Sequence, residues 1–130
     1  MAARSGCRWG LASALTLAVL LAGCTDAGPQ AGPGSVEVRV VSPNGSEGSA
    51  LVSVFAEGIR SVSAVSGRVF SHQVADTVRV VVVADAPGDL RFAVSLADAT
   101  AVVQGSVLQV ADAEDRLRST VADYALEFLR

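Results

Sequence analysis

Apolar and polar residues alternate along most of the chain after residue 35. The segment 36–40 reads Val-Glu-Val-Arg-Val, and the segment 90–97 shows the same alternation. A period of two is typical of a β-strand that buries one face and exposes the other. The pattern therefore predicts one-sided strands at 36–40 and 90–97, and a further strand is predicted for the largely apolar segment 51–55.

Shorter apolar segments, separated by residues that favour turns, extend this pattern. Glycine and asparagine tolerate positive φ and proline fixes φ, so clusters of these residues predict turns with a physical cause. Further strands are predicted at 62–65, 68–72, 77–83 and 101–110, and turns at 43–45, 57–58, 66–67 and 86–89.

Two of these strands carry additional expectations. The run from Val80 to Val83 is apolar at successive positions, which predicts a central strand covered on both faces. Gly105 interrupts the strand at 101–110. A glycine inside a strand predicts a bulge or the close crossing of another segment.

The C-terminal segment fits two patterns. Leu117, Val121, Tyr124 and Phe128 have helical spacing, whereas Tyr124, Leu126 and Phe128 share one face of a strand. Both alternatives stay open on the local pattern alone.

Seven or eight short strands without a clear helix predict an all-β fold. The expected architecture is a single antiparallel β-sandwich of about 7–9 strands. The phenylalanines are expected at inward strand positions in its core, and they are Phe55, Phe70, Phe92 and Phe128.

The N-terminus has the features of an export signal. Arg4 and Arg8 precede an apolar run of 11 residues from Leu11 to Leu21. A signal peptide has such a basic start and short apolar centre, whereas a membrane-spanning helix needs about 20 apolar residues.

The next residues, Leu21-Ala22-Gly23-Cys24, resemble the lipobox of bacterial lipoproteins. The resemblance implies signal peptidase cleavage between Gly23 and Cys24. It also implies that Cys24 carries a thioether-linked diacylglycerol and often an N-linked acyl chain such as palmitate, which would make membrane lipid a partner. The alternative is an ordinary secretory signal, with Cys24 an incidental thiol.

These features divide the chain into three expected parts. They are a signal peptide at 1–23, predicted as a helix and removed, a lipidated and flexible Gly/Pro linker at 24–35, and the β-sandwich at 36–130. The expected location is the cell envelope, lipid-anchored and exported. Thr25, where an aspartate commonly marks inner-membrane retention, favours the outer membrane in a Gram-negative cell, and Asp26 weakens that inference.

Charge and cysteine content narrow the possible partners. The net charge is −3, and −5 after loss of the two N-terminal arginines, without any basic cluster. Nucleic-acid binding therefore has no electrostatic support. Cys7 would leave with the signal and Cys24 would carry lipid, so no disulfide is expected.

Catalytic and metal-binding patterns are sparse. His72 is the only histidine, no Gly-x-Ser-x-Gly motif occurs, and His72 is expected at the surface or rim. Zinc needs several His and Cys ligands. No cofactor, transition-metal site or enzyme activity is therefore expected.

One acidic cluster gives a weak indication of a calcium site. Asp112, Glu114 and Asp115 form the densest acidic cluster, and calcium prefers such oxygen ligands. The neighbouring Arg116 and Arg118 would neutralise the cluster, so a solvated acidic loop is the competing interpretation.

From Ala50 onward the chain resembles a group of uncharacterised bacterial lipoproteins with one small β-domain. The shared elements are Val52–Gly58, Val69-Phe70, Asp76–Val80 and Tyr124–Leu126. The group is distantly similar to cohesin-like and immunoglobulin-like sandwich modules. The resemblance implies a loop at 112–119 and a final strand at about 122–129.

The resemblance supplies no functional residues. The expected function is a non-catalytic, lipid-anchored module for protein interaction, adhesion or assembly. The alternatives are a ligand-binding module for glycans or calcium-dependent partners and, less favoured, a small envelope enzyme. Glycan binding gains no support from the aromatic residues, because stacking surfaces favour Trp and Tyr.

Overall fold

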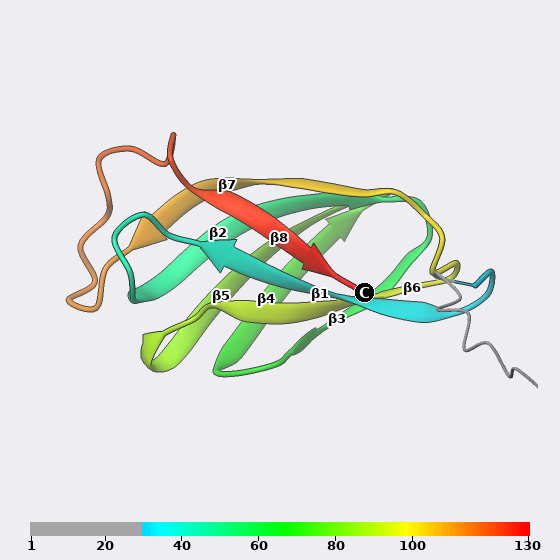
Figure 1. Ribbon diagram of the computed structural model, residues 1–130, viewed down its shortest axis with the longest axis horizontal. Helices are drawn as coiled ribbons and strands as arrows, with labels where there is room; N and C mark the ends of the chain where they lie inside the picture. Colours follow the sequence, from blue (N-terminus) through cyan, green and yellow to red (C-terminus); the bar gives the residue numbers. More distant parts are fainter. Residues whose placement is uncertain (1–29) are drawn as a thin grey trace, which may run out of the picture.

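The computed structural model describes residues 30–130, and every regular element in that range is a strand (Figure 1). The strands are β1 (Gly34–Val41), β2 (Glu47–Ala56), β3 (Ile59–Ala64), β4 (Arg68–Val74), β5 (Thr77–Gly88), β6 (Arg91–Leu96), β7 (Val103–Ala111) and β8 (Ala125–Leu129). Over these residues no helix is of a length and hydrophobicity that would span a membrane.

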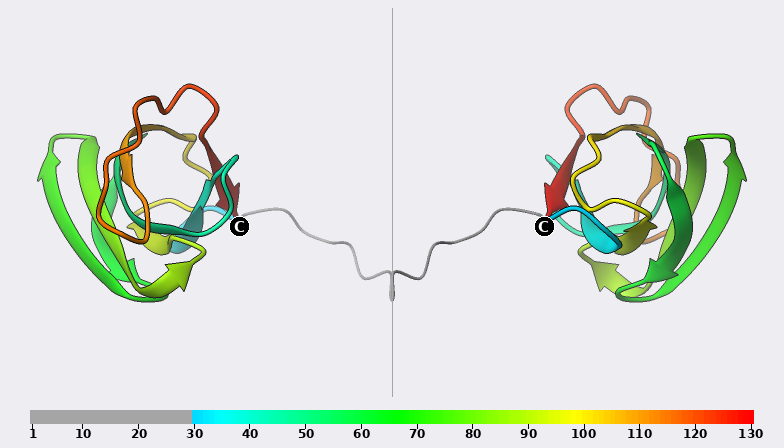
Figure 2. Two further views of the ribbon diagram at one scale, coloured as in Figure 1. Left: turned by 90° about the vertical axis from the view of Figure 1, so that its left-hand side faces the viewer. Right: turned by 90° about the vertical axis from the view of Figure 1, so that its right-hand side faces the viewer.

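The strands form two four-stranded antiparallel sheets packed face to face (Figures 1 and 2). Sheet A has the order β3-β6-β1-β8, and sheet B has the order β4-β5-β2-β7. The predicted antiparallel β-sandwich is confirmed. β1 begins at Gly34, two residues before the expected start of the domain.

Alternating apolar residues from both sheets fill the space between them. Every second side chain is buried along β6 and most of β1, from Ala50 to Ala56 in β2 and from Val78 to Val82 in β5, as the period of two predicts. Phe92 and Leu96 are the largest buried apolar side chains among residues that are mostly valine. Both cysteines precede residue 30, so side-chain packing and hydrogen bonds stabilise this domain without a disulfide.

The expectation that β5 is covered on both faces is wrong. β5 is central in its sheet, between β4 and β2. Val80 and Val82 are fully buried, but Val81 between them is 36% exposed. Sheet A covers one face of sheet B, and the opposite face of β5 is in contact with solvent at Val81.

The expected tight turn at 86–89 is also wrong. β5 continues to Gly88, and its ladder with β2 shifts register between the pairs Ser49–Val83 and Glu47–Gly88. Residues 84–87 therefore form an irregular bulge before the chain crosses to β6. Pro87 lies in this bulge, where its missing N–H costs no ladder hydrogen bond.

Gly105 marks a close crossing, one of the two outcomes that the sequence predicts. A Cβ at this position would lie 2.6 Å from the carbonyl oxygen of Ser53 and 2.8 Å from Cδ1 of Leu126. It would also lie 3.5 Å from Cζ of Phe128. Glycine therefore lets the side chains of β8 pack directly on β7.

The bulge of β7 lies three residues further along the strand than Gly105. Leu51 pairs with Gln109 and Val52 pairs with Val107, which leaves Leu108 as the additional residue. The bulge was thus not predictable from the glycine, because it depends on the register of β7 against β2.

The C-terminal segment ends in a strand, as the family resemblance implies. β8 begins at Ala125 and pairs with β1 over five residues. Residues 112–124 form no helix, and one isolated bridge joins Leu117 to Ala111. The helical alternative is therefore wrong.

The two open sides of the sandwich differ. On one side, β7 and β8 close the gap through the contact at Gly105. On the other side β4 lies at the rim of the molecule, as the end views show (Figure 2). Even its inward positions Ser71 and Gln73 are exposed. Apolar side chains therefore close the β7/β8 side, whereas on the β3/β4 side the link is a hydrogen bond from Nε2 of Gln73 on β4 to the carbonyl oxygen of Ile59 on β3, at 3.1 Å.

Replacing Gly105 by alanine tests this closure. We expect Gly105→Ala to lower the free energy of unfolding by roughly 1–3 kcal/mol, because the new methyl group would clash with the backbone of β2 at Ser53 and with Leu126 of β8. Chemical denaturation of the full chain measures the effect. Ser106→Ala, on the exposed face of the same strand, is the control and should change stability by less than about 0.5 kcal/mol. Equal stabilities of the two variants would contradict the close crossing.

Candidate functional site

The outer face of sheet B carries large apolar side chains in contact with solvent. Phe55 is 50% exposed, Phe70 58% and Val74 65%. The expectation that all four phenylalanines lie in the core is therefore wrong for Phe55 and Phe70. Phe92 is fully buried, and Phe128 is partly buried against the core.

Strand register arranges these side chains in rows across the sheet. Phe70 pairs with Val81, and Val81 pairs with Leu51, so three apolar residues on β4, β5 and β2 form one row. Val74, Thr77 and Phe55 form another row near the end of the same strands. We call this surface the apolar face, comprising Leu51, Phe55, Phe70, Val74 and Val81.

The charged groups on the apolar face are arginines. Arg68 and Arg79 project from β4 and β5, and neither forms an ion pair within residues 30–130. Five other arginines among residues 30–130 do have a carboxylate or carbonyl partner, and they are Arg39, Arg91, Arg116, Arg118 and Arg130. His72 lies opposite Arg79 and is exposed, in agreement with its predicted position at the surface or rim.

Two hollows lie beside these side chains. One, with a volume of about 450 Å³, is lined by His72, Val74, Thr77 and Arg79. The second, about 180 Å³, is lined in part by Leu51, Val81 and Leu117. Neither brings several carboxylates or nucleophiles together, so the chemistry of this face is apolar contact supplemented by cationic hydrogen-bond donors.

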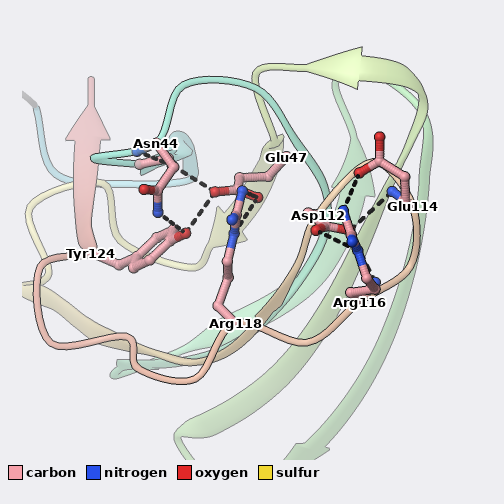
Figure 3. Close-up of polar contacts among 8 residues, drawn as sticks. Asn44, Glu47, Asp112, Glu114, Arg116, Arg118 and Tyr124 are labelled. Atoms are coloured by element: carbon pink, nitrogen blue, oxygen red, sulfur yellow. Dashed lines mark hydrogen bonds and ion pairs between the residues drawn. The ribbon is translucent and has the colours of Figure 1, made fainter.

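The buried carboxylate of Glu47 accepts hydrogen bonds from the β1–β2 turn and from the loop before β8 (Figure 3). Glu47 is 1% exposed at the start of β2. Its Oε1 accepts hydrogen bonds from the hydroxyls of Tyr124, at 2.6 Å, and Ser42, at 2.8 Å. Its Oε2 accepts from Nε and Nη2 of Arg118, at 3.2 and 3.1 Å. Asn44 in turn donates from Nδ2 to the Tyr124 hydroxyl, at 2.9 Å.

These contacts control the ionisation of Glu47. Burial alone would raise the pKa of its carboxyl group, but the hydrogen bonds from Tyr124, Ser42 and Arg118, with the positive charge of Arg118, hold that pKa below the usual 4.5. Four donated hydrogen bonds occupy both oxygens. The ionised carboxylate therefore connects the β1–β2 turn to the loop before β8, and it has no evident free position for acid–base chemistry.

Two of the three calcium candidates, Asp112 and Glu114, form side-chain contacts with neighbouring residues of the same loop. Oδ1 of Asp112 accepts hydrogen bonds from the backbone N–H groups of Glu114 and Arg116, both at 3.0 Å. Its Oδ2 lies 3.2 Å from Nε of Arg116, and Glu114 also pairs with Arg116 (Figure 3). Among residues 30–130 no group of three or more acidic, His or Cys side chains has an arrangement suited to a metal ion. Asp115 belongs to the same exposed loop.

The lipidation and cleavage residues, Gly23 and Cys24, lie outside the described residues.

The Glu47 cluster has no signature in the sequence, because Arg118 and Tyr124 lie 71 and 77 residues from Glu47. From the sequence alone, a single glutamate close to a predicted turn would be expected at the surface. Its role depends on the path of the loop between β7 and β8.

Comparison of the chain with protein families, with curated proteins and with solved structures finds no match.

Replacing Glu47 by glutamine tests the buried cluster. Because the pKa of Glu47 in the fold is below 4.5, its ionised form stabilises the fold above that pH. This stabilisation is lost as the pH falls from about 4.5 through the lowered pKa. At neutral pH, Glu47→Gln should cost about 2 kcal/mol, since charge-assisted hydrogen bonds are lost in a buried site.

Thermal unfolding between pH 3 and 7 measures this effect. Glu47→Gln should show a shallower decrease of the unfolding temperature on acidification than the unchanged chain. Glu57→Gln, at an exposed position after β2, is the control. Parallel curves for the unchanged chain and Glu47→Gln would show that the buried carboxylate does not govern acid stability.

Proposed function

We propose that the chain is a lipid-anchored, non-catalytic module of the cell envelope that binds another protein through the apolar face. The observation that carries this proposal is the exposure of Phe55, Phe70 and Val74 on one sheet face. Apolar patches of this kind are typical of interaction sites in soluble domains.

The composition of the face supports a protein partner. Aromatic residues and arginine are enriched in the energetically important parts of protein interfaces. The apolar face combines Phe55 and Phe70 with Arg68 and Arg79. An arginine without an ion pair in the monomer can pair with a partner without first breaking an internal contact.

The lipobox at Leu21–Cys24 supports anchoring. An extended segment from Cys24 to Gly34 would span at most about 35 Å. Two or three acyl chains give stable membrane attachment, whereas a single chain binds marginally. The sandwich would thus stay close to the membrane that carries its anchor.

Mass spectrometry of the N-terminal peptide tests the anchor. The protein is purified from the membranes of an expressing bacterium. We expect a peptide that begins at Cys24 and carries a diacylglyceryl group, with or without an N-acyl chain. An unmodified Cys24, or cleavage at another bond, would exclude lipid anchoring.

Photo-crosslinking in intact cells tests the binding face. A photoreactive phenylalanine analogue at Phe55, on the interior strand β2 of sheet B, should give a discrete crosslinked band, because this ring would contact the partner. The same analogue at Val102, which is 70% exposed and outside the apolar face, is the control. Equal crosslinking at the two positions, or none at Phe55, would exclude the apolar face as the binding site.

A further inference from the structure

Strand β4 presents an unusually regular free edge. All seven of its residues pair with β5 without any register shift, and within residues 30–130 β4 has no second strand partner. The strand contains no proline and no lysine, and Arg68 at its first position is its only formally charged residue. These features are the ones that let a strand edge accept another strand.

The other sheet edges have the protection that β4 lacks. β3 shifts register between Ile59 and Ser61, and β7 has the bulge at Leu108. β8 is only five residues long. Bulges and short length hinder edge-to-edge pairing, so β4 is the edge in the described part of the chain that is best suited to it.

The hairpin between β4 and β5 identifies the free backbone groups. Its turn has two residues, Ala75 and Asp76, and Ala75 has a positive φ of 53°. The pair flanking a two-residue turn, Val74 and Thr77, exchanges its backbone hydrogen bonds. Alternate residues of β4 therefore bond to β5. The backbone groups of Val69, Ser71 and Gln73 point outward.

We propose that β4 pairs with β4 of a second copy of this chain, antiparallel and about a two-fold axis. The axis passes through His72, so that His72 faces His72 of the second copy. In this register Ser71 faces Gln73 of the second copy, and the outward backbone groups of the two strands form the new ladder.

Side-chain complementarity selects this register. It places Phe70 opposite Val74 of the second copy, which covers two of the most exposed apolar residues. It also places Arg68 across from Asp76 of the second copy. Neither Arg68 nor Asp76 has an ion pair within residues 30–130, and two-fold symmetry would form this pair twice.

The neighbouring registers fit less well. An axis through Ser71 places Phe70 opposite His72 and Arg68 opposite Val74. An axis through Phe70 places Arg68 opposite His72, and both registers leave Arg68 without an anionic neighbour. Arg79 lies on β5, so in the proposed dimer the two β4 strands separate the two Arg79 side chains. These side chains are therefore three strand spacings apart, or roughly 14 Å. Their repulsion is largely screened at physiological salt.

The resulting dimer would join the two B sheets into one eight-stranded sheet. The apolar faces of both copies would then form one continuous surface on the same side. This inference does not depend on the proposed function, because the edge could pair whether or not the apolar face binds a further protein.

Single-cysteine crosslinking of the full chain tests the register. His72→Cys should give a disulfide-linked dimer under mild oxidation, because its Cβ would directly face its symmetry mate at a non-hydrogen-bonded position. Phe70→Cys and Ser71→Cys report the two neighbouring registers and should not link. The unchanged chain sets the background from Cys7 and Cys24, and Val102→Cys is the exposed control.

A several-fold excess of linked dimer in His72→Cys over all four other samples would support the proposal. Preferential linking of Phe70→Cys or Ser71→Cys would overturn the register. Linking of His72→Cys no greater than that of Val102→Cys would overturn the pairing itself.

Proline at position 71 gives an independent test. Ser71→Pro removes an outward N–H but no hydrogen bond to β5, and proline is tolerated on such an edge. We expect Ser71→Pro to keep its circular dichroism spectrum and to lose the dimer in sedimentation of the detergent-solubilised protein. Ser71→Ala should keep the dimer. A dimer that persists in a folded Ser71→Pro variant, or a monomeric unchanged chain at the highest concentration, would overturn the proposal.

Discussion

The close contact between β7 and β8 at Gly105 is the constraint on which the arrangement of the sandwich depends. Because a side chain is absent there, Leu126 and Phe128 can pack on β7 and close one side of the core. Arg118 and Tyr124, in the loop leading to β8, then reach Glu47 at the start of β2. Apolar packing and a buried ion pair thus fix the same side of the molecule.

On the opposite side a hydrogen bond from Gln73 to the backbone of Ile59 takes the place of this apolar packing, and the most exposed apolar side chains of β4 lie there. β4 extends to the rim of the molecule, where both of its faces are exposed at most positions (Figure 2). Phe70 and Val74 on this strand, together with Arg68, are available to a partner. The rigid side and the exposed side are therefore consequences of one asymmetry in how the two sheets meet.

Local alternation predicted the strands well, because burial of every second residue leaves a direct trace in the sequence. The regular alternation from Leu90 to Leu96 is the clearest case, and all of its apolar members are buried. The assignment of faces failed where both sets of positions are apolar. In β2, Val54 and Phe55 are adjacent candidates for the core, and the smaller residue is the buried one. The pairing register of β2 with its neighbouring strands decides which of the two residues faces the core. This register cannot be inferred from the local sequence of β2.

The candidate site was less predictable for the same reason. The acidic cluster around Asp112 is conspicuous in the sequence, yet Asp112 bonds to the adjacent backbone and to Arg116, and Glu114 pairs with the same arginine. Glu47 is inconspicuous, and its importance arises from partners that are distant in the chain. The apolar face likewise combines residues of three strands whose neighbourhood follows from pairing.

Residue-resolved amide hydrogen exchange at low protein concentration tests most directly whether the backbone edge of β4 is free. Along β4, the amides of Phe70, His72 and Val74 should exchange slowly, because they bond to β5. Those of Val69, Ser71 and Gln73 should exchange rapidly, because their N–H groups point to solvent. Uniform protection along β4 would contradict an open edge, and uniformly rapid exchange would contradict its pairing with β5.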